Sequence, residues 1–290
     1  MPSLEITTMI GCSLKCSVCP QDNLIKNYKS QNKYLTLENF KLILNKVPKF
    51  VRIDFSGMAE PWLNINCTDM FELTLKENYN VAIYTTLVGM STQDTDKVVS
   101  LIDKHKDQIK VLCIHLPDKH GNMTGWKNTD NYHYSLKNIL KFKDESFFQA
   151  MTMNSNEEVH SLIEKYKIEL VGYNKNWLAH TRAGSLSINE NNTKVTSNPI
   201  FNINPVSCAS TPFYDHNVLL PNGDVVLCCM DYSLKHIIGN LLENTYEELY
   251  LSNEMVRLMK ENKKSEYSKC SICKSCHNVK TYELQNNSWH

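Results

Sequence analysis

Along the first 175 residues, short apolar runs alternate with longer stretches whose apolar positions recur every three or four residues. Leu37, Phe40, Leu44 and Val47 have that spacing, which predicts an amphipathic helix, and Thr36 precedes them as a suitable N-cap. The short runs predict strands at residues 3–9, 50–55, 80–84, 109–116, 147–153 and 168–172. The longer stretches predict helices at residues 36–47, 66–77, 91–104, 132–143 and 155–166.

This alternation indicates βα units and a parallel sheet. About six such units fit before residue 175, whereas a complete eight-stranded barrel takes roughly 250 residues. We therefore expect an α/β fold in which residues 1–175 form a partial (βα)6 TIM-like barrel.

The pattern changes after the expected barrel. The next stretch is rich in Asn and Ser and is typical of a connector. Asn222 and Gly223 lie between two apolar runs and predict a β-hairpin, and residues 245–260 have helical spacing. The expected division of the chain is a barrel at 1–175, a connector at 176–206, a small domain at 207–280 and a tail at 281–290.

Composition and charge exclude several classes of protein. The chain has 290 residues, 42% of them hydrophobic, and its 31 basic and 31 acidic residues balance, so nothing favours nucleic acid or an anionic membrane as a partner. There is no apolar run of about 18 residues and no signal-peptide core, so we expect a cytoplasmic protein. Because the cytosol keeps thiols reduced, its 11 cysteines suggest metal ligands rather than disulfides.

Cys12, Cys16 and Cys19 form a C-x3-C-x2-C pattern directly after the first predicted strand. A [4Fe–4S] cluster is normally held by four cysteines, so three thiolates on one short loop leave the fourth iron open to another ligand. A structural zinc site is the alternative, but zinc prefers four protein ligands, and no fourth Cys or His stands nearby.

The cysteine spacing resembles the signature of the radical S-adenosylmethionine (SAM) superfamily. In that family the open iron binds the amino and carboxylate groups of SAM, and an electron from the cluster splits SAM to a 5′-deoxyadenosyl radical. The run SGMAEP that begins at Ser56 is similar to the family's Gly-Gly-Glu motif or its variants ending in Glu-Pro. The resemblance implies that this loop, with Ser56, Gly57 and Glu60, receives the ammonium group of SAM.

Three later residues take positions at which relatives contact the cofactor or the substrate. Thr85 ends the third strand, although the Asn and Gly that follow it in relatives are missing. His115 lies at the end of the fourth strand, where a hydrogen-bonded core histidine is the alternative. Arg182 belongs to an Arg-Ala-Gly stretch that relatives carry after the barrel, and it is suited to bind a carboxylate or phosphate. A bridge between barrel and extension is the alternative for Arg182.

Cys208, Gly223 and Cys228 fit a C-x14-G-x4-C pattern, which resembles the start of the SPASM and twitch extensions of radical SAM enzymes. Three more cysteines complete the set: Cys270, Cys273 and Cys276. Five cysteines cannot supply the usual ligands of two clusters. The resemblance therefore implies one auxiliary [4Fe–4S] cluster held by Cys208, Cys228 and two of the last three, with structural zinc as the alternative.

The remaining cysteines have a simpler interpretation. Cys229 follows Cys228 in a predicted strand, so alternation turns it to the opposite face, and we expect it to contribute only to packing. Cys67 and Cys113 stand in apolar or helical surroundings and are expected to be small buried residues.

The resemblance implies a radical SAM oxidoreductase that removes a hydrogen atom from a substrate, and analogy with relatives favours a small or sugar-like one. The auxiliary cluster would either accept the electron of the substrate radical or only anchor the extension over the barrel mouth. A reducing partner such as flavodoxin or ferredoxin is implied as well. A radical SAM maturase that modifies a peptide or protein is the first alternative. An iron–sulfur electron carrier or a zinc-bound scaffold without turnover is the alternative from another class. The sequence identifies no catalytic base.

Overall fold

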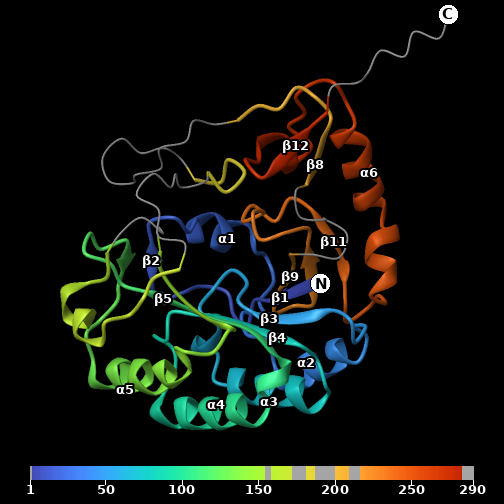
Figure 1. Ribbon diagram of the computed structural model, residues 1–290. Coiled ribbons are helices and arrows are strands. Elements are labelled where there is room, and N and C mark those ends of the chain that lie inside the picture. The colour runs from blue at the N-terminus through green and yellow to red at the C-terminus, as the bar shows by residue number, and fades with distance from the viewer. Residues whose placement is uncertain (1, 154–157, 172–180, 187–199, 209–215, 283–290) are drawn as a thin grey trace, which may run out of the picture.

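The computed structural model in Figure 1 describes residues 2–153, 158–171, 181–186, 200–208 and 216–282. One eight-stranded sheet runs through it in the order β11-β10-β9-β1-β3-β4-β5-β7. Five strands belong to the expected barrel: β1 (Ser3–Ile6), β3 (Arg52–Phe55), β4 (Val81–Thr85), β5 (Ile109–Leu116) and β7 (Phe148–Thr152). All four pairings among these strands are parallel, which confirms the α/β class and the barrel-type fold.

Helices cover one side of this sheet, and Figure 1 shows them as a row below it. They are α2 (Leu37–Leu44), α3 (Cys67–Lys76), α4 (Thr92–Lys104) and α5 (Asp130–Ile139). Three of them, α2, α3 and α4, begin within one residue of the predicted start. Thr36 accepts a hydrogen bond from the Asn39 N–H, and Ser91 forms a capping box with Asp94.

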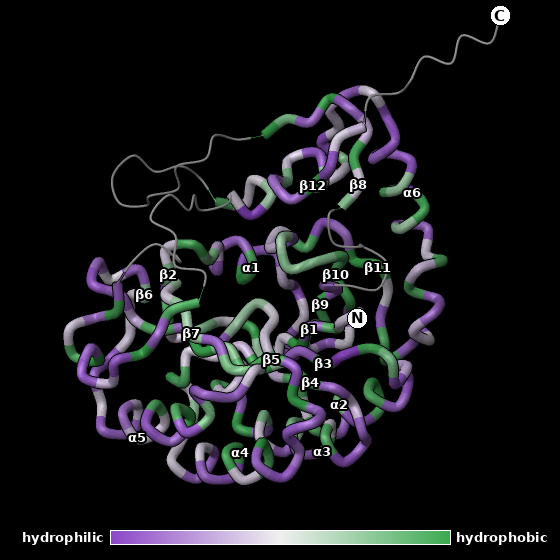
Figure 2. The backbone as a smooth tube through the Cα atoms, viewed as in Figure 1, coloured by the Kyte–Doolittle hydropathy of each residue, from purple (hydrophilic) through white to green (hydrophobic). Residues whose placement is uncertain are grey.

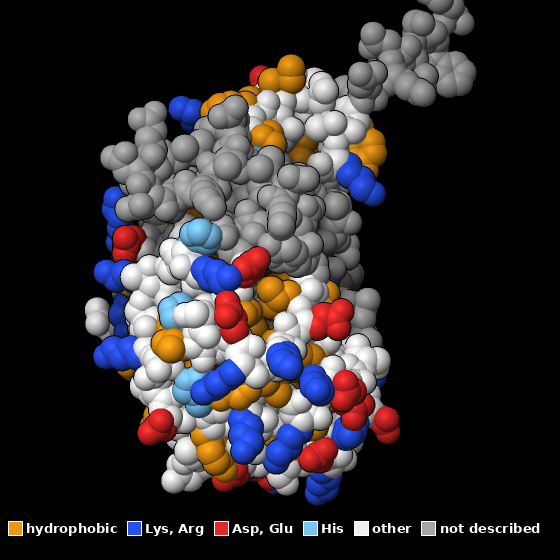
Figure 3. All heavy atoms as spheres, turned by 60° about the vertical axis from the view of Figure 1, so that its left-hand side comes forward, with side chains coloured by type: hydrophobic (Ala, Val, Ile, Leu, Met, Phe, Trp, Pro, Cys, Tyr) orange, Lys and Arg blue, Asp and Glu red, His pale blue; other side chains and the backbone are white. Residues whose placement is uncertain are grey.

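The core lies between the helices and the sheet. Four aromatic rings pack there with centroid separations of 5.6–6.3 Å: Phe40, Phe55, Trp62 and Phe71. Figure 2 shows hydrophobic positions along the strands and mixed polarity on the helices, as expected of helices with one buried face. On the face shown in Figure 3, basic and acidic side chains are interspersed, and ion pairs such as Lys97 with Glu72 link neighbouring helices.

The C-terminal part joins the same sheet. The predicted hairpin forms from β9 (Asn217–Leu219) and β10 (Asp224–Val226), with Gly223 at φ +89° in its turn, and β11 (Ile237–Asn240) follows. β9 pairs in parallel with β1, so the hairpin extends the barrel's sheet. Beyond it lie α6 (Asn253–Asn262) and a two-stranded sheet of β8 (Val206–Cys208) and β12 (Val279–Thr281).

Three predicted elements differ in the structure. Instead of the helix predicted at 155–166, the described part has a 3₁₀ helix at Ser161–Tyr166, which ends at Lys167 in the left-handed conformation (φ +49°). In the strand predicted at 168–172, residues 168–171 are irregular, although the Val171 N–H donates to the carbonyl of Ala150 in β7.

The third difference concerns the helix predicted at 245–260. It is split into a 3₁₀ helix, Glu247–Leu251, and α6, because Ser252 is extended and caps α6 by accepting from the Met255 N–H. Short elements that the sequence did not reveal are α1 (Gln21–Asn27), β2 (Lys15–Cys16) and β6 (Met123–Thr124). Among the described residues, no helix is both long and apolar enough to cross a membrane.

Candidate functional site

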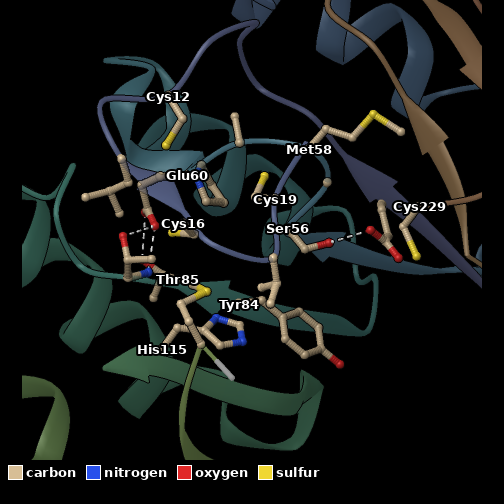
Figure 4. Close-up of a pocket in the computed structure, with 18 of the residues that line it drawn as sticks. Cys12, Cys16, Cys19, Ser56, Met58, Glu60, Tyr84, Thr85, His115 and Cys229 are labelled. Atoms are coloured by element: carbon tan, nitrogen blue, oxygen red, sulfur yellow. Dashed lines mark hydrogen bonds between the residues drawn. The ribbon is translucent and has the colours of Figure 1, made fainter. Parts of the chain in front are cut away.

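A cavity of about 540 Å³ opens at the carboxyl ends of the barrel strands. It is lined by Cys12, Cys16 and Cys19 and also by the six predicted cofactor-binding residues: Ser56, Gly57, Glu60, Thr85, His115 and Arg182. Figure 4 shows the three cysteines near Glu60, with Tyr84 and Cys229 farther along the cavity wall. The fold therefore brings together residues that lie far apart in the sequence.

The cysteine loop is fixed from outside by the segment that follows β5. β2 pairs with β6 in antiparallel fashion, which places Cys16 opposite Met123. The Ser17 N–H donates to the Asn122 carbonyl at 2.8 Å, and the Cys19 N–H donates to the Cys16 carbonyl at 3.0 Å. A strand of two residues leaves no pattern in the sequence, which explains why this support was not predicted.

The thiols of this loop are suited to bind a positively charged centre. Burial raises the pKa of Cys12 and of Cys16, and for Cys16 the neighbouring charges of Cys19, Cys12 and Glu60 add to the effect. Without a cation Cys12 and Cys16 stay protonated, whereas bound iron would supply the positive charge that stabilises their thiolates. The donor set thus fits a [4Fe–4S] cluster with one open iron. Within the described ranges, no three His, Cys, Asp or Glu side chains form a site for a single metal ion.

Glu60 is a buried carboxylate with all its acceptor positions in use. One oxygen accepts from the Thr85 hydroxyl (2.7 Å) and the Trp62 N–H (3.3 Å). The other accepts from the N–H and the hydroxyl of Thr86 at 2.6 and 2.7 Å. A carboxylate offers about four lone-pair sites, so Glu60 would exchange one of these donors if it bound SAM directly; the SAM contacts expected of Glu60 and Thr85 stay predictions. The contacts of Glu60 fix the loop after β3 to the end of β4.

Gly57 allows this loop to lie directly on the end of β1. Its φ is +66°, and a Cβ at this position would be 2.4 Å from Thr7 Oγ1 and 2.7 Å from the Thr7 nitrogen. Thr7 Oγ1 accepts a hydrogen bond from the Met58 N–H at 3.0 Å. The glycine of the predicted motif is therefore required by close backbone approach.

His115 faces the cavity rather than the core. Burial, and after it the positive charge of Arg182, lower the pKa of His115 to about 4, so the imidazole is neutral at physiological pH. No other described residue makes a hydrogen bond with its ring. The hydrogen-bonded core histidine, which was the alternative, is thus not what the structure shows.

The position of Arg182 agrees with both roles that the sequence left open, ligand binding and a bridge between barrel and extension. It lines the cavity, and its Nε donates to the Val18 carbonyl at 3.3 Å while Nη1 lies 3.8 Å from Met230 Sδ. It therefore bridges the cysteine loop and the C-terminal part and also presents a guanidinium to the cavity. Residues 177–180 of the stretch before it lie outside the described residues.

Cys229 packs against an apolar cluster as expected, but it also lines the cavity, where it lies near Glu5. Cys228 and Cys229 both follow the end of β10, and Cys228 lies near Cys273 and not in the cavity lining. Tyr232 also lines the cavity and was missed. Only the parallel pairing of β9 with β1 brings these residues to the site, and no local pattern predicts that pairing.

Four of the five C-terminal cysteines are neighbours. Burial raises the pKa of Cys273 to about 11, and the charges of Cys276 and Cys208 add to that effect. Cys273 in turn contributes to the raised pKa of Cys228. Cys270 instead lies exposed at the surface beside Arg257.

The loop that carries these cysteines is held by buried polar groups. The fully buried Lys274 donates to the carbonyls of Asn204 and Lys264 at 2.6 Å each. His236 Nε2 accepts from the Ile272 N–H at 3.2 Å. These bonds join three separate segments around Cys273.

Comparison with known proteins agrees with this arrangement. Residues 208–277 match the SPASM family, described as an iron–sulfur cluster-binding domain. No curated protein matches the chain significantly. The structure of BtrN in complex with AdoMet and 2-DOIA has a TM-score of 0.61 at 15% identity, covering 100% of this chain and 97% of that one.

Two other solved structures share the fold. Native anSMEcpe with bound AdoMet has a TM-score of 0.55 at 15% identity, covering 96% of this chain and 88% of that chain. Streptococcus suis SuiB bound to precursor peptide SuiA has a TM-score of 0.52 at 13% identity, covering 93% and 75%. The chain thus shares its fold with these solved structures, and residues 208–277 carry the SPASM-type iron–sulfur cluster-binding domain that the resemblance implied.

Gly57→Ala tests the close approach at the candidate site, with Gly121→Ala as its matched control. Both glycines have positive φ (+66° and +71°), but a Cβ at Gly121 meets nothing within 4 Å. The control should lose about 1–2 kcal/mol of stability from backbone strain alone. Gly57→Ala should lower the melting temperature further and reduce bound iron. Equal melting temperatures for the two variants would contradict the account.

Proposed function

We propose that this protein is a radical SAM enzyme in which Cys12, Cys16 and Cys19 hold a [4Fe–4S] cluster that binds SAM at its open iron. The observation that carries the proposal is the meeting of these three thiols and the loop Ser56–Pro61 in one cavity. When bound, the cluster supplies the electron that cleaves SAM to methionine and a 5′-deoxyadenosyl radical, which takes a hydrogen atom from the substrate.

The residues around the cavity have distinct parts in this proposal. Backbone carbonyls between Ser56 and Ala59 accept hydrogen bonds from the SAM ammonium, because the Glu60 carboxylate is already saturated. Arg182 binds a carboxylate of SAM or of the substrate. The neutral imidazole of His115 hydrogen-bonds to the bound molecules. The enclosing wall keeps water from the reactive carbon.

The inner part of the cavity supports a small, hydroxyl-rich substrate. Glu5, Asp54 and Tyr84 line it together with His115. Glu5 accepts from the Ser56 hydroxyl at 3.2 Å, and Asp54 pairs with Arg52 at 2.6 Å. Burial raises the pKa of Asp54 to about 6 and that of Tyr84 to about 12, so the phenol stays protonated as a donor. Hydrogen-bond donors and acceptors both line this part of the cavity, which suits a substrate with hydroxyl groups. Because the cavity must also hold SAM, the space that remains suits a small molecule.

We propose one auxiliary [4Fe–4S] cluster, held by Cys208, Cys228, Cys273 and Cys276. The position of Cys273 near Cys208, Cys228 and Cys276 and the SPASM match support it, and the surface position of Cys270 argues against that residue. The auxiliary cluster would accept the electron left on the substrate, which makes the reaction a net oxidation.

Modification of a peptide is the second candidate. The shared fold with SuiB, whose solved structure contains its precursor peptide, supports it. One side chain of a peptide would occupy the same inner cavity. The two candidates are distinguished by separate incubations with selectively deuterated amino-sugars or cyclitols and with selectively deuterated peptides. Deuterium should appear in 5′-deoxyadenosine only when the true class of substrate is present.

The central activity is tested by anaerobic incubation of the reconstituted protein with dithionite and SAM. Release of 5′-deoxyadenosine is expected, and Cys16→Ala should abolish it because one iron loses its thiolate. Cys67→Ala is the control, since Cys67 is buried in α3 away from the cavity. If the intact protein, with its clusters verified, releases no 5′-deoxyadenosine, it is an electron carrier and the proposal fails.

Iron content tests the auxiliary ligands. The intact protein and Cys270→Ala should each hold about eight irons, whereas Cys273→Ala should hold about four. Cys273 and Cys270 lie on the same loop, so the pair separates ligand loss from disturbance of the loop. About four irons with one zinc in the intact protein would instead support the zinc alternative.

A further inference from the structure

Tyr232 brings the C-terminal part of the chain into contact with the first cysteine loop. The five-residue segment 228–232 begins at Cys228, beside the proposed auxiliary ligands, and ends at Tyr232 in the cavity wall. Tyr232 is only 5% exposed, and its Oη lies 3.6 Å from Cys19 Sγ. Among the described residues, Cys19 is the one hydrogen-bonding partner of this hydroxyl.

The position of Tyr232 is fixed by the turn around Asp231. The Asp231 N–H donates to the Cys228 carbonyl at 3.0 Å. The fully buried carboxylate of Asp231 accepts from the N–H groups of Lys235 (3.0 Å) and His236 (2.7 Å). A turn closed by three such bonds holds the tyrosine ring in one place.

The direction of the hydrogen bond follows from the chemistry of the sulfur. A Cys19 thiolate bound to iron carries no proton, so the tyrosine hydroxyl must be the donor. Gln21 adds a second donor, since its Nε2 lies 3.5 Å from the same sulfur. Hydrogen bonds to cluster sulfurs stabilise negative charge and thereby favour the reduced, more negative cluster.

We propose that the Tyr232 hydroxyl donates a hydrogen bond to the Cys19 thiolate and raises the reduction potential of the first cluster. Tyr232 is thus a residue of the C-terminal part that adjusts the reduction potential of a cluster bound to the barrel. The inference rests on the proposed cluster at Cys12, Cys16 and Cys19. It predicts that the C-terminal part influences how readily the first cluster accepts the electron needed for SAM cleavage.

Potentiometric titration of the reconstituted holoprotein, followed by the EPR signal of the reduced first cluster, tests this. Tyr232→Phe should shift the midpoint potential to more negative values. Tyr28→Phe is the matched control: Tyr28 is 4% exposed, packs in the same apolar group, and donates its hydroxyl to the Asn32 carbonyl instead. The control should titrate like the unchanged protein.

A second variant keeps the test informative if Tyr232→Phe loses its cluster. Replacement of Tyr232 by 3-fluorotyrosine preserves shape and makes the hydroxyl a stronger donor, so the midpoint should move to less negative values. An unchanged midpoint in both Tyr232 variants overturns the inference. Absence of any first-cluster signal in the unchanged protein would overturn the proposed function itself, so the two failures are distinguishable.

Discussion

The parallel pairing of β1 on both of its edges determines the geometry of the site. β1 pairs with β3 on one side and with β9 on the other, so the loop that leaves its carboxyl end is fixed between the barrel and the C-terminal part. The cysteines of that loop therefore face residues from both halves of the chain. Had the hairpin packed elsewhere, Cys229 and Tyr232 would lie away from Cys19, and the cavity would lack one wall.

Buried polar groups keep the walls of this cavity in place. Glu60 alone satisfies four donors from three residues, and a buried donor left without a partner costs roughly 1–3 kcal/mol. The carboxylate thus joins two loops that hydrophobic contact alone would leave free to move. It also places negative charge near Cys12 and Cys16, which favours a cationic centre at the thiols.

Much of the barrel and of its cysteine motif could be predicted from local patterns. Helical spacing and caps such as Thr36 and Ser91 are local, and so is the C-x3-C-x2-C loop. The contacts that the prediction missed depend on pairing between distant segments. The pairing of β9 with β1 decides that Cys229 faces the cavity, and the surface position of Cys270 separates it from the other four C-terminal cysteines. Glu60 was recognised as a motif residue, yet only the structure shows that Thr85 and Thr86 saturate it.

The central claim is that the open iron of a cluster at Cys12, Cys16 and Cys19 binds SAM. Electron–nuclear double resonance on the reduced protein tests it most directly, using SAM labelled with ¹⁵N at its amino group. The account predicts a hyperfine coupling between the cluster and that nitrogen, because the amino group is bound to iron. A reduced cluster whose spectrum is the same with labelled and unlabelled SAM would contradict the account.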